Sequence, residues 1–170
     1  MRRGQAAILA VLLAAPLAAL PEVSGIEKFF RVDDRVSTGA QPTVPQIAAL
    51  AETGFRTIIN LREPSEHDAV AEEAAARRLD LRYTNIPVKT AEPRPEQVDA
   101  FLKSLEDPEI FPVFIHCGSG NRVGAFWMIR RVLDGWTPEA AEREARQIGL
   151  KSANLKDFAL DYIRSHAKEK

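Results

Sequence analysis

The chain has almost no cysteine. Among 170 residues there is one, Cys117. Exported domains too small to build a sufficient core commonly hold themselves together with several disulfides, and a lone cysteine cannot form a disulfide within its own chain. The fold must therefore be stabilised by an apolar core, and the cysteine is available for chemistry.

The chain also lacks an excess of charge and a metal-binding pattern. Lys and Arg number 23 against 24 Asp and Glu, which gives a formal net charge of −1. Such a balance provides no electrostatic attraction for nucleic acid or for an anionic membrane surface, so we expect no nucleic-acid partner. Because no His, Cys and carboxylate cluster has the spacing of metal ligands, we expect no metal and no cofactor.

No hydrophobic run is long enough to span a membrane, but a short one lies at the N-terminus. Arg2 and Arg3 precede residues 6–20, which are uncharged and apolar apart from Pro16. This run is shorter than the roughly 20 residues of a membrane-spanning helix. Small residues lie near two plausible cleavage sites, one at 17–19 and the other at 23–25, as in a secretory signal peptide. We expect residues 1–25 to be a signal peptide of an exported, periplasmic or secreted protein, with an uncleaved N-terminal anchor as the alternative.

The remaining residues, 26–170, predict one domain in which strands alternate with helices. Residues 31–38 indicate one or two short strands, 55–61 a buried strand, 81–88 another strand, and 113–116 a strand that ends beside Cys117. Between them we expect a helix capped by Thr43, an alanine-rich helix capped by Ser65 and running to about Leu79, and a helix over 97–106. Two helices separated by residues 134–138 complete the chain. This order is typical of an α/β fold with a mostly parallel sheet and helices on both faces.

Ligands bind such sheets beyond the carboxyl ends of the strands, and Cys117 lies at this position. It is followed by the short loop Gly118, Ser119, Gly120 and Asn121, then by Arg122 and a predicted helix. Backbone N–H groups of a glycine-rich loop and of a helix N-terminus form an anion site. A positive environment of this kind lowers the pKa of a thiol from about 8.5 to between roughly 3.5 and 7.5. The pattern predicts a nucleophilic thiolate above an anion-binding loop.

The run from His116 to Arg122 resembles the signature loop of cysteine-dependent phosphatases of the tyrosine and dual-specificity type. The whole chain after residue 25 is similar to the bacterial phosphatase-like family of β-lactamase-hydrolase-like proteins, in the motifs STGAQP (37–42), GFRTIINLR (54–62), IPV (86–88) and the loop followed by VGA (123–125). The resemblance implies the tyrosine/dual-specificity phosphatase fold and hydrolysis of phosphomonoesters.

By that resemblance, Cys117 forms a cysteinyl-phosphate and Arg122 binds two phosphate oxygens. The N–H groups of the loop, from Gly118 through Ser119, Gly120 and Asn121, bind the remaining oxygens. His116 supports the loop and helps to keep the thiolate ionised.

Three features differ from the phosphatase pattern. Four residues rather than five separate Cys117 from Arg122, and Val123 stands where a hydroxyl residue usually follows the arginine. The upstream loop 89–96 has no aspartate to act as general acid, so Glu92 is the candidate.

These differences leave two alternatives to phosphatase activity. The shorter loop suits a rhodanese-like sulfurtransferase that carries a persulfide on Cys117, which would make a sulfur-containing compound the substrate instead of a phosphorylated one. A non-catalytic module that only binds an anion is the other. Any membrane association would come from the N-terminal segment alone.

Overall fold

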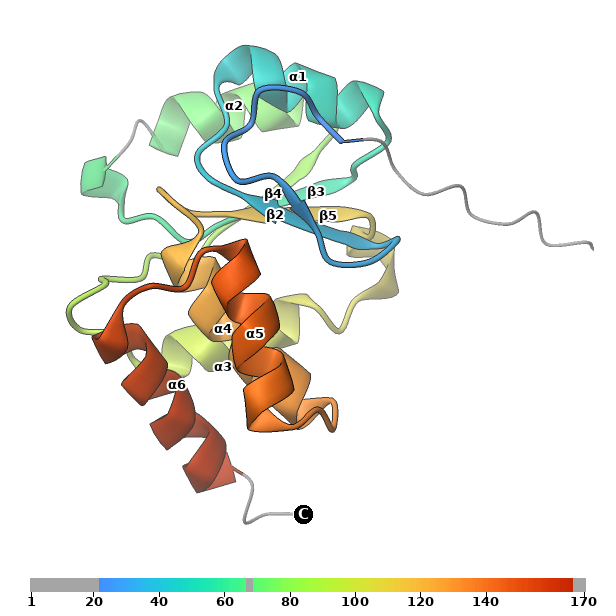
Figure 1. The fold of residues 1–170 in the computed structure, drawn as a ribbon. Coiled ribbons are helices and arrows are strands. Elements are labelled where there is room, and N and C mark those ends of the chain that lie inside the picture. The colour runs from blue at the N-terminus through green and yellow to red at the C-terminus, as the bar shows by residue number, and fades with distance from the viewer. Residues whose placement is uncertain (1–21, 67–68, 167–170) are drawn as a thin grey trace, which may run out of the picture.

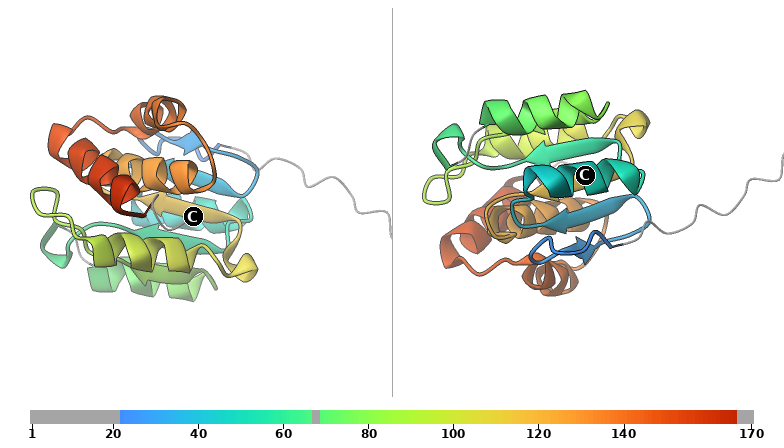
Figure 2. Two further views of the ribbon diagram at one scale, coloured as in Figure 1. Left: turned by 90° about the horizontal axis from the view of Figure 1, so that it is seen from below. Right: turned by 90° about the horizontal axis from the view of Figure 1, so that it is seen from above.

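The computed structural model describes residues 22–66 and 69–166, which form three layers (Figure 1). A five-stranded sheet lies between two groups of helices. Helices α1 (Val44–Glu52) and α2 (Ala69–Arg78) cover one face. The other face is covered by α3 (Pro95–Ser104), α4 (Asn121–Leu133), α5 (Pro138–Ile148) and α6 (Ala153–His166), as the views from below and above show (Figure 2).

The sheet has the order β1-β2-β5-β3-β4. Its strands are β1 (Phe30–Arg31), β2 (Val36–Gly39), β3 (Thr57–Asn60), β4 (Arg82–Asn85) and β5 (Val113–His116). Only the pairing of β1 with β2 is antiparallel. The four parallel strands end in register, with His116 beside Gly39 and Asn60, and Asn60 beside Asn85. The predicted α/β class with a mostly parallel sheet is confirmed.

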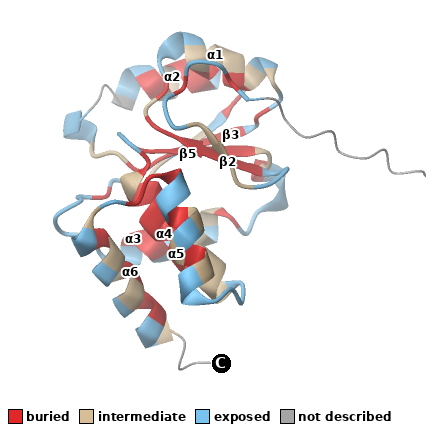
Figure 3. Cartoon of the chain, viewed as in Figure 1, coloured by how far each residue is buried: buried red, intermediate tan, exposed pale blue. Residues whose placement is uncertain are grey.

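Two apolar clusters hold these layers together, one on each face of the sheet. Strand β5 contributes to both because its side chains alternate: Phe114 faces α1 and α2, while Val113 and Ile115 face α3 to α6. Figure 3 shows β5 and much of α4 buried. The strand that leads to Cys117 is thus in the centre of the molecule, where apolar burial at about 25 cal/mol per Å² fixes its position.

The predicted capping residues of two helices are confirmed. Thr43 accepts a hydrogen bond from the N–H of Gln46, whose side chain accepts one from the N–H of Thr43, which forms a capping box. Thr137 accepts from the N–H of Ala140, and Pro138 is the first residue of α5. These local signals need no tertiary context, so the sequence shows them directly.

Several predicted boundaries are wrong. Ser65 lies within the 3-10 turn η1 (Pro64–Glu66) instead of capping α2, which is described over Ala69–Arg78. The strand predicted over 81–88 is limited to Arg82–Asn85. Residues 121–166 form three helices rather than the predicted two, because α5 ends at Ile148 and α6 begins at Ala153. The unpredicted turn between α5 and α6 packs against the Cys117 loop.

The predicted signal peptide largely lies outside the described residues. Of residues 22–25, however, Val23 is 3% exposed and packs with Ile26 in the cluster under α1 and α2. The folded domain therefore begins upstream of residue 26. None of the helices within 22–66 and 69–166 is both long and apolar enough to cross a bilayer.

Candidate active site

Cys117 follows the last residue of β5 directly, at the edge of the sheet where the parallel strands end. Its side chain is almost fully buried, and the chain then turns through Gly118 to Gly120 into α4. Arg122 is the second residue of α4 and is 5% exposed. Strand, loop and helix therefore bring the predicted nucleophile and the predicted arginine together.

The loop is closely packed from outside by the turn between α5 and α6. Gly120 caps α4 in a left-handed conformation with φ of 79°, and a Cβ there would lie 2.2 Å from the carbonyl oxygen of Ile148. A Cβ on Gly149, whose φ is 139°, would lie 2.7 Å from the carbonyl oxygen of Ser119. Only glycine fits at both positions, so the two backbones touch with no side chain between them.

Polar contacts hold the same outer side of the loop. The Oδ1 atom of Asn121 accepts hydrogen bonds from the N–H groups of Lys151 (2.8 Å) and Ser152 (3.1 Å). The ammonium of Lys28 donates to the carbonyl oxygen of Ser119 at 2.9 Å. The Asn121 side chain thus holds the loop in place, so only the backbone N–H of Asn121 remains for the predicted binding of substrate.

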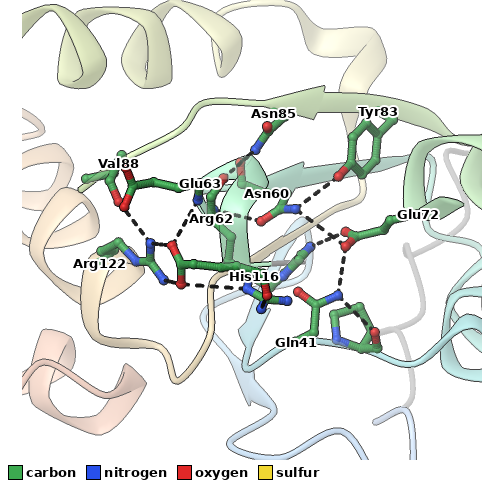
Figure 4. Close-up of polar contacts among 12 residues, drawn as sticks. Gln41, Asn60, Arg62, Glu63, Glu72, Tyr83, Asn85, Val88, His116 and Arg122 are labelled. Carbon is green, nitrogen blue, oxygen red and sulfur yellow. Dashed lines mark hydrogen bonds and ion pairs between the residues drawn. The ribbon is translucent and has the colours of Figure 1, made fainter. Parts of the chain in front are cut away.

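The guanidinium of Arg122 is held by two protein groups. Its Nη1 and Nη2 atoms donate to the two carboxylate oxygens of Glu66 at 2.5 and 2.7 Å, and Nη1 also donates to the carbonyl oxygen of Val88 at 2.9 Å (Figure 4). These bonds use three of the five N–H donors of an arginine. The remaining two, on Nε and Nη2, lie along one edge of the guanidinium. This edge has the geometry that binds two oxygens of one phosphate.

Charges reinforce this arrangement. Burial opposes the charge of Arg122, but the hydrogen bond with Glu66 and the nearby Cys117 raise the pKa of its guanidinium above the usual value. The hydrogen bond from Arg122 is likewise the main reason why the pKa of Glu66 falls to about 2. Glu66 is therefore an anion at any physiological pH, and Arg122 stays charged beside Cys117.

His116 points away from solvent into a buried polar cluster (Figure 4). Its Nε2 atom lies 2.8 Å from Oε1 of Glu72, a residue of α2 that is 4% exposed. The other oxygen of Glu72 accepts hydrogen bonds from Gln41 (2.7 Å) and from Asn60 (3.4 Å), and Asn60 also donates to Tyr83. Helix α2 thereby contacts the residue before Cys117 from behind the sheet edge.

Glu92 lies on an exposed loop and forms an ion pair with Lys89 at 2.8 Å. The hydrogen bond from Lys89 lowers the pKa of the Glu92 carboxyl. Glu92 lines a surface depression with Glu63 and Arg94, next to the strand-end segment whose Val88 carbonyl binds Arg122. Its ion pair with Lys89 favours the deprotonated form, which is the wrong form for a general acid.

Sequence reasoning missed Glu66 and Glu72, the two carboxylates that bind Arg122 and His116. Both belong to the charged stretch 63–73, where glutamates resemble ordinary solvated residues. No single glutamate gave a signal. The available signal was that an arginine and a histidine beside one loop each require a partner when they are buried, and acidic residues are the natural partners. Within the described parts of the chain, no group of three or more His, Cys, Asp and Glu side chains is arranged to hold a metal ion.

This fold and this loop define a phosphatase-like domain. A family model described as "DSP-PTPase phosphatase fused to NAD+ Kinase" matches residues 21–159, and the chain belongs to that family. The resemblance inferred from the sequence is thereby confirmed.

Curated relatives agree with the family. The chain is 33% identical over 112 residues to the β-lactamase hydrolase-like protein of Xylella fastidiosa strain Temecula1, and 30% identical over 112 residues to that of Agrobacterium fabrum strain C58. Each match covers 64% of this chain but 26% of the relative. The chain thus spans about a quarter of the length of these relatives.

Solved structures share the fold at low sequence identity. A DUF442 protein of Shewanella putrefaciens has a TM-score of 0.72 at 20% identity, with 85% of this chain and 96% of that chain covered. The core catalytic domain of the PP-IP phosphatase SIW14 from S. cerevisiae has a TM-score of 0.72 at 19% identity, covering 86% and 95%. P. aeruginosa TpbA in complex with pTyr has a TM-score of 0.65 at 18% identity, covering 82% and 90%.

Proposed function

We propose that the protein hydrolyses phosphomonoesters through a cysteinyl-phosphate on Cys117. The observation that carries this proposal is the Arg122 guanidinium, which Glu66 and Val88 hold by its other N–H donors so that its Nε–Nη2 edge stays beside the only cysteine of the chain. A phosphate bound there meets two N–H donors of Arg122 and the free N–H groups at the start of α4.

In the first step the Cys117 thiolate attacks phosphorus, the S–P bond forms, and the P–O bond to the leaving group breaks. The leaving oxygen takes a proton from a general acid or from water. In the second step water attacks phosphorus, the S–P bond breaks, and inorganic phosphate and the thiolate are released. The charge that develops on the phosphoryl oxygens faces Arg122 and the loop N–H groups throughout.

Two features shape the rate of these steps. Val123 is buried and provides no hydroxyl to stabilise the departing thiolate, so release of phosphate from Cys117 depends on Arg122 and on the loop itself. Glu92 is the acid that the sequence predicts, but its ion pair with Lys89 works against protonation, so we expect little acid catalysis from it. Esters with good leaving groups, which need no acid, should therefore be the best substrates.

The decisive experiment measures hydrolysis of an aryl phosphate by the wild type and by Cys117→Ser. We expect the variant to lose at least about 10³-fold in turnover while its melting temperature stays unchanged, because the nucleophile is lost and the packing is kept. Turnover by the variant near the wild-type rate would refute covalent catalysis by Cys117.

Sulfur transfer is the second candidate, and the four-residue loop between Cys117 and Arg122 favours it. Thiosulfate-to-cyanide transfer is therefore assayed on the same preparation. If neither activity appears and orthophosphate or vanadate still raises the melting temperature, the protein only binds anions. The pTyr complex of TpbA makes a phosphotyrosine peptide the first biological ester to test.

We further propose that the protein is exported, with residues 6–20 as the hydrophobic part of its leader. Val23 is a core residue, so a cut after Ala19 would leave the core intact, whereas a cut after Gly25 would remove Val23. N-terminal sequencing of the protein from a periplasmic extract tests this. A mature N-terminus downstream of Val23, or retention of the whole chain in the membrane fraction, would contradict it.

A further inference from the structure

Both residues that flank the Cys117 loop are bound by carboxylates from one short stretch of chain. Glu66 in η1 binds Arg122, which ends the loop. Glu72 in α2 binds His116, which precedes the loop (Figure 4). The first contact belongs to the substrate-binding arginine. The second contact reaches only a side chain that faces away from the anion site, and the proposed reaction leaves it unexplained.

The surroundings of Glu72 are those of a carboxylate anion. Gln41 and Asn60 present N–H donors to Oε2, and the Tyr83 hydroxyl remains protonated because burial raises its pKa, as do Glu72 and Glu73. At 4% exposure, such an anion needs a countercharge to balance the cost of desolvation. The imidazole of His116, which carries a positive charge when both nitrogens are protonated, contacts this carboxylate at 2.8 Å.

The imidazole has a second nitrogen. Nδ1 of His116 is buried and has no hydrogen-bond partner within the described part of the chain. Against an anionic carboxylate Nε2 must carry a proton, so Nδ1 alone determines whether the ring is neutral or an imidazolium. Among the described residues, the Tyr83 hydroxyl from β4 interacts with Glu72, Glu73 also acts on Tyr83, and Cys117 is the next residue after His116.

We propose that Glu72 is a positioning residue that keeps His116 as an imidazolium directly before Cys117. This role rests on the proposed thiolate chemistry. A positive ring in the adjacent residue favours the thiolate, and a fixed ring holds the backbone from which the loop departs. The carboxylate touches neither substrate nor sulfur and acts through His116 alone.

The test measures the rate of Cys117 alkylation by iodoacetamide as a function of pH, which reports the thiolate directly because the chain has no other cysteine. The variant is Glu72→Gln. Its matched control is Glu73→Gln, which removes the same charge from the next, partly exposed position of α2, where Glu73 pairs with Arg77. We expect the alkylation midpoint of Glu72→Gln to rise by about one pH unit, with a rate about tenfold lower below the midpoint. The midpoint of Glu73→Gln should stay at the wild-type value.

An unchanged or lower midpoint in folded Glu72→Gln would overturn the proposal, because a purely structural contact changes stability and leaves the thiolate pKa alone. A second measurement needs no change at position 72. Ring ¹⁵N NMR of the wild type should show one histidine with both nitrogens protonated at pH 7, and Cys117→Ser should lower the pH at which that ring loses a proton. Three neutral rings at pH 7 would refute the imidazolium.

Alkylation requires no ester hydrolysis, so the two proposals fail separately. A raised midpoint in Glu72→Gln without any aryl phosphatase activity would count against the proposed function and leave the role of Glu72 standing. Aryl phosphatase activity together with an unchanged alkylation midpoint in Glu72→Gln would support the proposed function and overturn the role of Glu72.

Discussion

Helix α4 carries a buried or half-buried arginine near each end, and each binds a glutamate through two nitrogens. Arg122 near the first turn presents Nη1 and Nη2 to Glu66. Arg131 in the last turn presents Nε and Nη2 to Glu144, and its guanidinium lies over the rings of Trp127 and Trp136 at 5.0 and 4.5 Å.

The difference lies in which edge of the guanidinium remains available. Arg131 binds Glu144 through its Nε–Nη2 edge, whereas the same edge of Arg122 lies beside Cys117 and the N-terminus of the helix. Burial and a paired glutamate are therefore poor markers of a functional arginine. The groups that face the Nε–Nη2 edge, a carboxylate for Arg131 and the Cys117 loop for Arg122, distinguish a structural arginine from a binding one.

Replacing each arginine with lysine tests whether the orientation of the guanidinium edge determines function. Arg122→Lys keeps the charge but cannot bind Glu66 and two phosphate oxygens together, so we expect kcat/KM for an aryl phosphate to fall by about 10²- to 10³-fold. Arg131→Lys should retain activity within about twofold and lose thermal stability instead. Equal losses of activity in both variants would show that the edge is not the deciding feature.

Two glycines test the packing behind the loop. In Gly149→Ala the new Cβ would lie 2.7 Å from the carbonyl oxygen of Ser119, and we expect a loss of about 1–3 kcal/mol in unfolding free energy with about tenfold lower activity. Gly135→Ala is the control, because Gly135 also has a positive φ (98°) but nothing lies within 4 Å of its Cβ. It should lose stability through backbone strain alone and keep its activity.

Acid titration tests the Glu66–Arg122 ion pair. The pKa of Glu66 is lowered from 4.5 to about 2, so its stabilising contribution is complete above pH 4.5 and is lost as the pH falls towards 2. The carboxylate is about a third exposed, and screening by solvent limits the contribution to about 1 kcal/mol. Chemical denaturation of the wild type and Glu66→Gln should show a difference at pH 7 that shrinks below pH 4.5. A difference independent of pH would contradict the ion pair.

The smallest effect is expected for Glu92→Gln. Because Lys89 keeps Glu92 deprotonated, the variant should change the turnover of an aryl phosphate by less than about threefold, with the same pH–rate profile. Loss of the alkaline limb of that profile in Glu92→Gln would instead establish Glu92 as the general acid.

Much of the fold could be predicted because its signals are local. The capping box at Thr43, the Thr137–Pro138 helix start and the buried strand before Cys117 each depend on a few neighbouring residues. The turn at 149–152 could not be predicted in this way. The backbone of this turn packs against the Cys117 loop where Gly149 meets Ser119, and these two residues are distant in sequence.

The α/β class, the loop from His116 to Arg122 and the resemblance to a phosphatase-like family could all be read from the sequence. Strand periodicity, glycine positions and the order of motifs are properties of neighbouring residues along the chain. Three contacts became visible in the folded structure alone. Glu66 binds the Nη1 and Nη2 atoms of Arg122, and Glu72 binds the His116 ring. The Asn121 side chain accepts hydrogen bonds from the N–H groups of Lys151 and Ser152. The physical reason is that these are pairings of charge and hydrogen bonds between residues far apart in sequence. Their partners become defined only when the sheet brings its strand ends together.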